Sequence, residues 1–245
     1  MASPPWFFAP PERWSGNEVA LPPDESHHAL RVMRISPPDV LTVTDGNGVV
    51  ARCSASRADS DVLVAEVLER QEHRRLRPEV ALYQGAAKGH KNDDVVERVA
   101  ELGVGEVFVY ESRRSVARWN RDKVEKLNDR WAAIARSAAK QSRNPFTLQA
   151  RAGVSWTELL RLLSKEPLVV VLWEDAMLPL RTALGGPADR VALVVGPEGG
   201  LERDEAEQLA DAGGQLVSLG PRILRTENAP VVATAALLYH YGLIG

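Results

Sequence analysis

Two glycine-rich segments near the C-terminus each follow directly on a run of apolar residues. Val191–Val195 leads into Gly196–Gly200, and Leu216–Leu219 leads into Gly220–Ala229. An apolar run without alternation is typical of a strand buried on both faces of a parallel sheet. Glycines at such strand ends let backbone amides approach a ligand closely, and open α/β sheets bind ligands at this edge. Either segment alone is equally well explained as a tight turn, but together they predict a ligand site.

The elements that must position these segments alternate between strands and helices from about residue 78 onward. This alternation predicts a parallel sheet with helices on both faces. Glycines such as Gly103 and Gly213 suit the left-handed end of a helix. The expected strands cover residues 80–84, 106–110, 168–173, 191–195 and 215–219, and the expected helices cover residues 92–102, 121–141, 155–164, 203–212 and 229–241.

The first 74 residues have a different pattern, in which turn residues separate short apolar runs. Val40–Thr44 and Val49–Cys53 flank Asp45–Gly48, an arrangement that favours a β-hairpin. Val62–Leu68 adds a further strand by its alternation. Several short strands in so small a unit predict a compact barrel. We expect a domain boundary between residues 74 and 75, in an arginine-rich segment that ends at Pro78.

A short helix is predicted over His27–Arg34, ahead of the hairpin. Its apolar residues Leu30, Met33 and Val32 are expected to face inward. Two adjacent histidines without other ligand residues nearby are weak evidence for a metal, so no metal site is expected.

The charge of the chain is unevenly distributed. It has 30 basic and 33 acidic residues, and the formal net charge of −3 alone argues against a nucleic-acid partner. Residues 113–143 nevertheless hold ten lysines and arginines against three acidic residues. Local basic density supplies contacts to phosphates. A helix face that is merely solvated is an equally good explanation of this segment alone.

Composition and missing motifs exclude several classes of protein. The hydrophobic fraction of 44% suffices for one large core or two modest ones. Cys53 is the one cysteine, so an internal disulfide is excluded and a small buried residue is predicted. No apolar stretch approaches the ~20 residues of a membrane helix, and residues 1–10 lack the features of a signal peptide, so we expect a cytoplasmic protein. The glycine motifs of P-loop and dinucleotide sites, the serine-hydrolase elbow and the HExxH zinc motif do not occur.

Taken in order, the motifs resemble those of the RsmE family of SPOUT methyltransferases. Gly196–Gly200 matches the family's GPEGG, and Leu219–Glu227 matches its LGxRILRTE segment. The resemblance spans nearly the whole chain and is weakest before Ser26. Asn228 departs from the family's usual threonine, but as a helix N-cap followed by proline it still favours a helix start. Shorter matches are Lys88-Gly89, Glu101–Val104, Ser112–Val116 and Ala138–Arg143.

This resemblance implies a fold, an activity and partners. The implied fold is α/β, with a small N-terminal PUA-like β-barrel that helps hold RNA (residues 1–74) and a C-terminal SPOUT trefoil-knot parallel-sheet domain (residues 75–245). The strand pattern alone does not predict the knot, because threaded chains are rare. The implied activity is S-adenosylmethionine-dependent methylation of a uridine N3 in small-subunit (16S) ribosomal RNA, in the assembled 30S particle, by a homodimer. The alternatives are a ribose 2′-O RNA methyltransferase of the same fold and a non-catalytic RNA-binding protein of ribosome assembly.

The resemblance also implies which residues bind S-adenosylmethionine. Glycines of the first loop would clear space for it, and apolar residues of the second would form a slot for adenine. Glu174, at the end of the strand expected over residues 168–173, would hydrogen-bond the ribose of the cofactor or face its amino group. The full expected set is Leu172, Glu174, Val195, Gly196, Glu198, Gly199, Gly200, Leu219, Gly220, Ile223, Leu224 and Arg225.

Methyl transfer to uracil N3 makes a specific chemical demand. Because the protonated nitrogen is a poor nucleophile, the enzyme must remove its proton or stabilise negative charge on the ring oxygens. Arg225 is the candidate for charge stabilisation, since a guanidinium stays charged and offers a planar fork of donors. Glu198 and Glu227 are candidate proton acceptors. An ordinary salt bridge from Arg225 to either glutamate is the structural alternative.

Seven residues are expected to contact RNA. They are polar or basic and lie in the predicted short helix, in the basic segment or in the family motifs. They are Arg31, Arg34, Lys88, Arg113, Arg114, Gln141 and Arg143.

Overall fold

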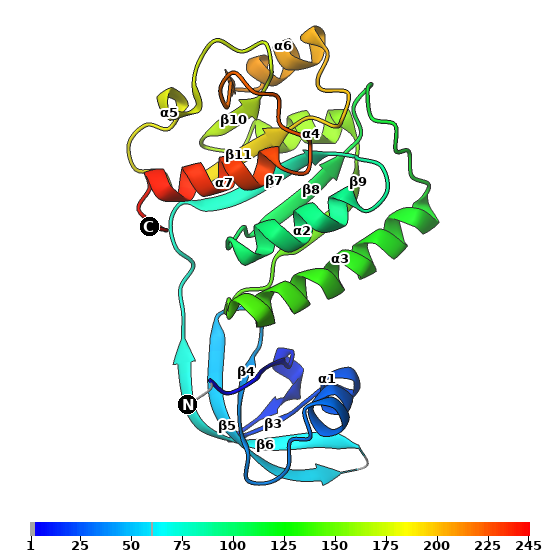
Figure 1. Ribbon diagram of the computed structural model, residues 1–245, viewed down its shortest axis with the longest axis vertical. Coiled ribbons are helices and arrows are strands. Elements are labelled where there is room, and N and C mark those ends of the chain that lie inside the picture. The colour runs from blue at the N-terminus through cyan, green and yellow to red at the C-terminus, as the bar shows by residue number, and fades with distance from the viewer. Residues whose placement is uncertain (1–2, 60) are drawn as a thin grey trace. The chain divides into compact units, whose positions relative to one another are not determined.

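The computed structural model describes residues 3–59 and 61–245 (Figure 1). The chain forms two compact units. The N-terminal unit comprises the chain up to Arg75 together with Arg136–Thr147, and the C-terminal unit comprises Leu76–Ala135 and Leu148–Gly245. The N-terminal unit is thus completed by a segment from the middle of the sequence. The domain boundary after residue 74 stays a prediction.

The N-terminal unit is built on a curled six-stranded sheet with the strand order β1-β4-β5-β6-β3-β2. The predicted hairpin is confirmed, because β4 and β5 pair antiparallel across residues 45–48. The Asp45 carboxylate accepts hydrogen bonds from the backbone amides of Asn47 (2.7 Å) and Val49 (3.0 Å), which holds the turn. The elements are β1 Trp6–Phe8, the 3-10 helix η1 Pro11–Arg13, β2 Trp14–Ser15, β3 Glu18–Ala20, β4 Val40–Thr44, β5 Val49–Asp59 and β6 Val62–Glu72.

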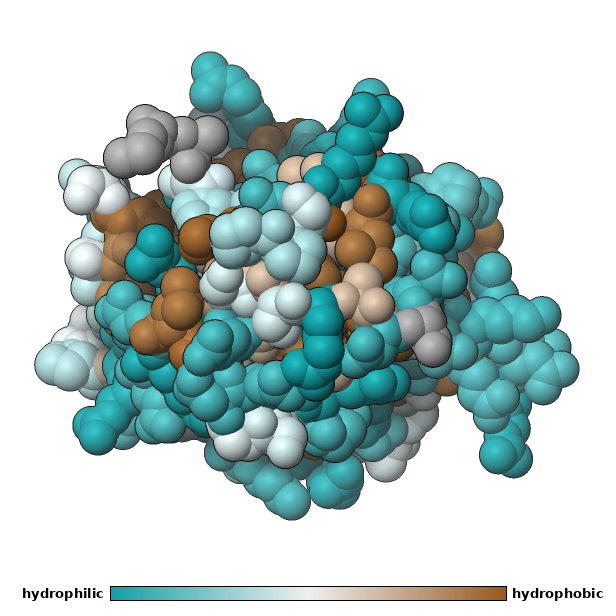
Figure 2. Space-filling model, turned by 90° about the horizontal axis from the view of Figure 1, so that it is seen from below, coloured by the Kyte–Doolittle hydropathy of each residue, from teal (hydrophilic) through white to brown (hydrophobic). Residues whose placement is uncertain are grey.

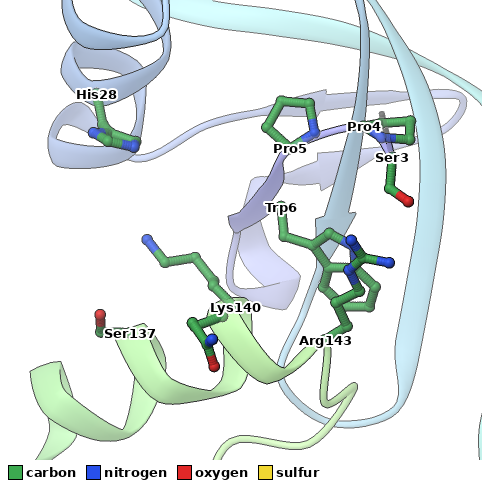
Figure 3. Close-up of a pocket in the computed structure, with 9 residues that line it drawn as sticks. Ser3, Pro4, Pro5, Trp6, His28, Ser137, Lys140 and Arg143 are labelled. Atoms are coloured by element: carbon green, nitrogen blue, oxygen red, sulfur yellow. The ribbon is translucent and has the colours of Figure 1, made fainter. Parts of the chain in front are cut away.

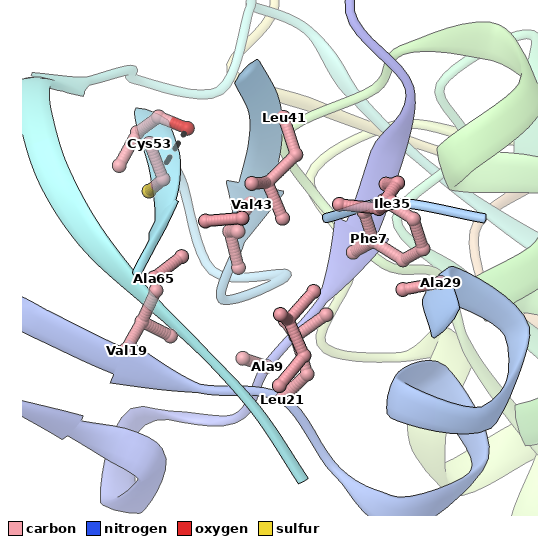
Figure 4. Packing of buried hydrophobic residues seen from close by; sticks show 13 residues of the cluster. Phe7, Ala9, Val19, Leu21, Ala29, Ile35, Leu41, Val43, Cys53 and Ala65 are labelled. Atoms are coloured by element: carbon pink, nitrogen blue, oxygen red, sulfur yellow. Dashed lines mark hydrogen bonds between the residues drawn. The ribbon is translucent and has the colours of Figure 1, made fainter. Parts of the chain in front are cut away.

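The inner face of this sheet carries the core of the N-terminal unit (Figure 4). Phe7, Leu21 and Leu41 are fully buried there, and each contributes roughly 1.5–3 kcal/mol through removal of apolar surface from water. Cys53 is fully buried among them, as predicted, and burial raises the pKa of its thiol to about 12. The thiol therefore stays protonated and packs as a small apolar group.

A short helix is found close to the predicted place, over residues 23–32 rather than 27–34, and of its three predicted inward residues only Leu30 packs against the core. Helix α1 (Pro23–His27) continues into the π-helical turn η2 (His28–Val32). Ala29 is buried, whereas Val32 and Met33 are 61% and 47% exposed, so their predicted inward placement is wrong. The amide of Met33 donates to the carbonyl of His28, five residues back, and this wider turn departs from the 3.6-residue period.

Figure 2 shows that hydrophobic residues reach the surface in small patches among hydrophilic ones.

The C-terminal unit contains an all-parallel six-stranded sheet with the order β12-β10-β11-β7-β8-β9. The five predicted strands are confirmed, and β9 is an additional one at the edge. The central strand β11 is almost entirely buried, which explains its unbroken apolar run. The bounds are β7 Glu79–Gly85, β8 Glu106–Tyr110, β9 Gln149–Val154, β10 Val169–Leu172, β11 Arg190–Val195 and β12 Gly214–Val217.

The five predicted helices are confirmed, with the short α5 in addition. α7 begins as predicted, with Pro230 in its first turn, but the Asn228 side chain makes no capping hydrogen bond. The carbonyl of Arg225 instead accepts hydrogen bonds from the amides of Asn228 and Ala229. No helix in the described part of the chain is long and apolar enough to span a membrane. The bounds are α2 Lys91–Glu101, α3 Arg121–Ser142, α4 Trp156–Leu163, α5 Leu180–Ala183, α6 Arg203–Asp211 and α7 Ala229–His240.

Candidate functional site

Four loops meet at one edge of the C-terminal sheet. They follow β7, β10, β11 and β12, which are parallel neighbours, so their carboxyl ends lie side by side. The order along the sheet differs from the order along the chain, because β10 and β11 come between β12 and β7. Parallel α/β sheets bind ligands where the strand order reverses in this way.

The end of β7 lies against the loop that follows β11. A Cβ atom added to Gly85 would be 2.3 Å from the backbone nitrogen of Pro197, so only glycine allows this approach. The Tyr110 hydroxyl donates to the carbonyl of Val195 at 3.1 Å, which fixes the end of β11 from the side of β8. The start of the glycine loop is therefore held by two neighbouring strands.

Thr226 connects the loop after β12 to the same place. Its hydroxyl donates a hydrogen bond to the carbonyl of Gly196 at 2.8 Å. The hydroxyl oxygen accepts from Nε2 of Gln84 at 2.8 Å, and Gln84 is completely buried. A chain of hydrogen bonds therefore joins β7, the loop after β11 and the loop after β12, and such a connected network fixes their relative positions.

Glu174 brings the loop after β10 to this cluster. Its Oε1 atom would be 2.6 Å from a Cβ atom on Gly200, so the carboxylate lies directly over the glycine. Gly200 also has φ +71°, a conformation that strains other residues. The structure thus brings together two of the residues that the resemblance assigns to cofactor binding.

Protein atoms account for part of the glycine pattern. A Cβ atom on Gly199 would be 3.0 Å from the Cβ of Arg114, and the Arg114 guanidinium donates to the carbonyl of Gly199 at 3.1 Å. A Cβ atom on Gly196 would likewise be 3.3 Å from the backbone carbonyl carbon of Gly200. Packing of the loop against itself and against Arg114 therefore favours glycine at these two positions, in addition to any clearance for a ligand.

Lys91, the first residue of α2, bridges the two candidate proton acceptors. Its ammonium lies 3.3 Å from Oε1 of Glu198 and 3.7 Å from Oε2 of Glu227. The side chains of the two glutamates are only 25% and 14% exposed. The backbone amide of Lys88 also donates to Glu198 at 2.9 Å. One cation at the start of α2 therefore lies between the two carboxylates.

Glu198 and Glu227 differ in their hydrogen bonding. Burial acts to raise the pKa of Glu198, but hydrogen bonds from the amide of Lys88 and from its own amide, together with Lys91, outweigh it and lower the pKa. Oε2 of Glu227 is buried and accepts no hydrogen bond from the described residues. Glu198 is thus stabilised as an anion, whereas one oxygen of Glu227 keeps its accepting capacity.

Arg225 and Ile223 present their side chains to solvent. Arg225 is exposed and forms no ion pair with any residue in 3–59 or 61–245, so the salt bridge to Glu198 or Glu227 does not form. Ile223 is 90% exposed, although Leu219 and Leu224 beside it are half-buried. The loop after β12 therefore offers a free cation and an uncovered apolar side chain next to the fixed loops.

The seven residues expected to contact RNA are divided between the two units. In the C-terminal unit, Arg113 pairs with Glu202 and Asp204 at the start of α6, and its amide donates to buried Glu205 at 2.8 Å. Arg113 and Arg114 therefore brace the glycine loop while remaining about half exposed. In the N-terminal unit, Arg31 pairs with Asp61 on the surface. Arg34, Gln141 and Arg143 are exposed.

Sequence reasoning missed Lys91 and Gln84. Lys91 follows the Lys88-Gly89 motif by two residues, so a basic residue at the exit of β7 was the available signal. Gln84 interrupts an apolar strand immediately before Gly85, and a polar residue in a buried strand calls for a partner. Neither signal identifies the partner residues. Among the described residues, no group of three or more His, Cys, Asp or Glu side chains could hold a metal ion.

Comparison with known proteins agrees with this arrangement. Residues 74–238 match the family model of an RNA methyltransferase domain, and residues 21–67 match that of an RNA methyltransferase PUA domain. A methyltransferase structure from Legionella pneumophila, in complex with the bound cofactor S-adenosylmethionine, has a TM-score of 0.88 and 26% identity, and the match covers 98% of each chain.

A ribosomal RNA small subunit methyltransferase E from Neisseria gonorrhoeae, bound to S-adenosylmethionine, has a TM-score of 0.86 and 28% identity, with 97% of this chain and 98% of that chain covered. The protein of the same name from Mycobacterium bovis is 35% identical over 227 residues, which are 91% of this chain and 87% of the relative. The chain therefore belongs to the family of ribosomal RNA small subunit methyltransferase E.

Proposed function

We propose that this protein uses S-adenosylmethionine to methylate N3 of a uridine in small-subunit ribosomal RNA. The observation that carries the proposal is the unpaired guanidinium of Arg225, on a loop that Thr226 ties to the glycine loop. Fixed positive charge is what the anionic uracil ring requires as its N3 proton leaves. Family membership supports the same reaction class.

The residues at the strand ends fit a bound S-adenosylmethionine. When bound, the cofactor supplies an electrophilic methyl group. Ile223, Leu219 and Leu224 offer apolar surface for its adenine, and the 90% exposure of Ile223 leaves that surface available. Glu174, held over Gly200, offers carboxylate oxygens to hydroxyl or amino groups. Residues at the ends of β10 and β11 and in the two glycine loops complete the expected set, which includes Leu172, Val195, Gly196, Glu198, Gly199 and Gly220.

Arg225 and one glutamate have different roles toward the uracil, which are charge stabilisation and proton acceptance. Arg225 stabilises negative charge on a ring oxygen through its donor fork. Glu227 is the other candidate proton acceptor; the Lys91 ammonium lies 3.7 Å from its Oε2, and no hydrogen bond from the described residues engages that oxygen. Glu198 has a lowered pKa and is engaged by Lys88 and Lys91, so it is the weaker base. Lys91 keeps both carboxylates at the site.

Several further properties belong to the same proposal. We infer a PUA-like RNA-binding domain before residue 75 and a trefoil knot in the domain after it. Arg31, Arg34, Lys88, Arg113, Arg114, Gln141 and Arg143 contribute RNA contacts. The enzyme works in the cytoplasm on the assembled 30S particle, where its ribosomal RNA substrate is found. It acts as a homodimer, which light scattering at micromolar concentration tests, since a monomer alone would contradict it.

A methyl-transfer assay tests the proposed reaction class. The protein is incubated with methyl-labelled S-adenosylmethionine and with unmethylated 30S particles, free small-subunit RNA or large-subunit RNA in parallel. We expect label in small-subunit RNA, with the 30S particle the better substrate. Saturable binding of S-adenosylhomocysteine in calorimetry separates an enzyme from a non-catalytic assembly protein. Binding without label in any RNA would contradict the assigned substrate, and no binding would contradict the enzyme.

A further inference from the structure

The N-terminal unit contains a second candidate site, a cavity of about 450 Å³ (Figure 3). It lies between the start of β1, the turn η2 and the last turns of α3, all of which belong to this unit. Trp6 and the prolines before it form one wall, and His28 forms part of another. Ser137, Lys140 and Arg143 reach it from α3 and the residue after it.

The cationic side of the cavity is built into the fold. The Lys140 ammonium forms an ion pair with Glu25, whose side chain is 7% exposed. Glu25 in turn accepts a hydrogen bond from the backbone amide of Phe8 at 3.3 Å. An ammonium has three donors, so pairing with Glu25 orients Lys140 and leaves donors free for the cavity. Arg143 adds a second cation, and no acidic residue among those that the structure describes lines the cavity.

The chemistry of the lining selects a class of ligand. Lys140 and Arg143 suit phosphate oxygens. Trp6 offers an aromatic face, and proteins that bind unpaired nucleotides stack bases on such faces. The amide of Gln141 and the hydroxyl of Ser137 can donate to or accept from a base edge. The volume lies in the range of about 300–1,000 Å³ that small-ligand sites occupy.

We propose that this cavity binds one unpaired nucleotide of the RNA substrate, with its base against Trp6 and its phosphate on Arg143 and Lys140. The inference rests on the proposed function, which supplies the RNA, but assigns a separate subsite within the N-terminal unit. The site exists only because α3 returns residues 136–143 to the N-terminal unit. RNA binding by this unit is therefore coupled to the sequence of a helix that begins in the other unit.

Fluorescence anisotropy with short labelled oligonucleotides tests the subsite on the full chain. The probes are a single-stranded oligouridylate and an abasic oligomer with the same number of phosphates. We expect Trp6→Ala to weaken oligouridylate binding on the order of 10-fold and Trp6→Phe to restore most of it, because stacking on aromatic rings contributes substantially per base. Binding of the abasic oligomer should hardly change in either variant.

Arg143→Ala provides the complementary measurement. It should weaken binding of both oligomers and lower the slope of log affinity against log salt by about 0.7, the value for one phosphate contact on a single strand. Arg13→Ala is the matched control, because Arg13 is exposed in the same unit but does not line the cavity. Circular dichroism establishes that each variant is folded.

The possible outcomes separate this inference from the proposed function. Equal oligouridylate affinity of the wild type and Trp6→Ala, or equal losses for both oligomers in Trp6→Ala, would overturn the nucleotide subsite. Methyl transfer by Trp6→Ala should show a raised KM with kcat retained at saturating RNA. Absence of methyl transfer in the wild type would overturn the proposed function and leave the anisotropy result standing.

Discussion

The hydroxyl of Thr226 donates to the carbonyl of Gly196 at 2.8 Å and joins two loops that are thirty residues apart in sequence. Both loops belong to motifs of the family, and Gln84 completes the link from inside the sheet. The candidate site is therefore a single hydrogen-bonded unit rather than a set of independent loops. The exposed Arg225 and Ile223 lie in the same loop, shortly before Thr226.

Thr226→Val keeps the shape of the side chain but removes the hydroxyl. The carbonyl of Gly196 and Nε2 of Gln84 each lose a partner in a buried place, which costs about 1–3 kcal/mol of unfolding free energy. Urea unfolding measures this loss. Thr226→Ser retains the hydroxyl and should recover most of the stability. Equal stability of the wild type and Thr226→Val would mean that the bond does not hold the loops.

Arg225→Ala tests charge stabilisation. Turnover should fall on the order of 10²-fold, while RNA affinity changes little, because the interaction forms mainly in the transition state. Raising the pH should restore part of the rate, since hydroxide then helps deprotonate the uracil. Arg222→Ala is the matched control, an exposed arginine of the same loop. Unchanged kcat in Arg225→Ala under saturating RNA and cofactor would remove Arg225 from the mechanism.

Ile223→Asp tests the apolar slot for adenine. Because Ile223 is 90% exposed, the substitution should leave the free energy of unfolding almost unchanged. Calorimetry should show that the affinity for S-adenosylhomocysteine is reduced roughly 10-fold or more, because the bound ligand would cover the Ile223 side chain and this apolar contact is lost. Leu76→Asp, at another strongly exposed apolar residue, should bind normally. Equal affinities in the two variants would place adenine elsewhere.

Lys91→Met tests the cation between the two carboxylates. The folded-state pKa of Glu198 is lowered, so its contribution to stability is present above the unfolded pKa of about 4.3 and is lost as the pH falls through the folded value. Without Lys91 the pKa of Glu198 should rise toward the unfolded value, so this contribution to stability should be smaller and its loss should be complete at a higher pH. Circular dichroism during acid titration measures the shift. Lys91→Arg should behave like the wild type, and identical acid transitions in all three proteins would contradict the bridge.

Much of the C-terminal sheet was predictable, because parallel strands buried on both faces form unbroken apolar runs such as Val191–Val195. β9 escaped prediction, since Gln149–Val154 alternates weakly, includes Gly153 with φ +75° and pairs with a register shift. The short strands β1 to β3 carry too few residues for a periodic signal.

The composition of the candidate site was predictable only in part. The glycine loops can be predicted from the local sequence, because the chain needs glycine where another backbone segment approaches closely. The Lys91 bridge and the Gln84–Thr226 bond join residues far apart in sequence, and no local pattern specifies such partners. The return of residues 136–147 to the N-terminal unit is equally non-local, since α3 is one continuous helix.

Mass spectrometric mapping of the methylated nucleotide tests the central claim most directly. Small-subunit RNA is methylated by the wild-type protein, digested to nucleosides and fragmented. We expect one methyl group on the base of a uridine, at N3, and a product yield lower on the order of 10²-fold with Arg225→Ala at matched enzyme concentration and short times. A methyl group on the ribose, or on a base other than uracil, would contradict it.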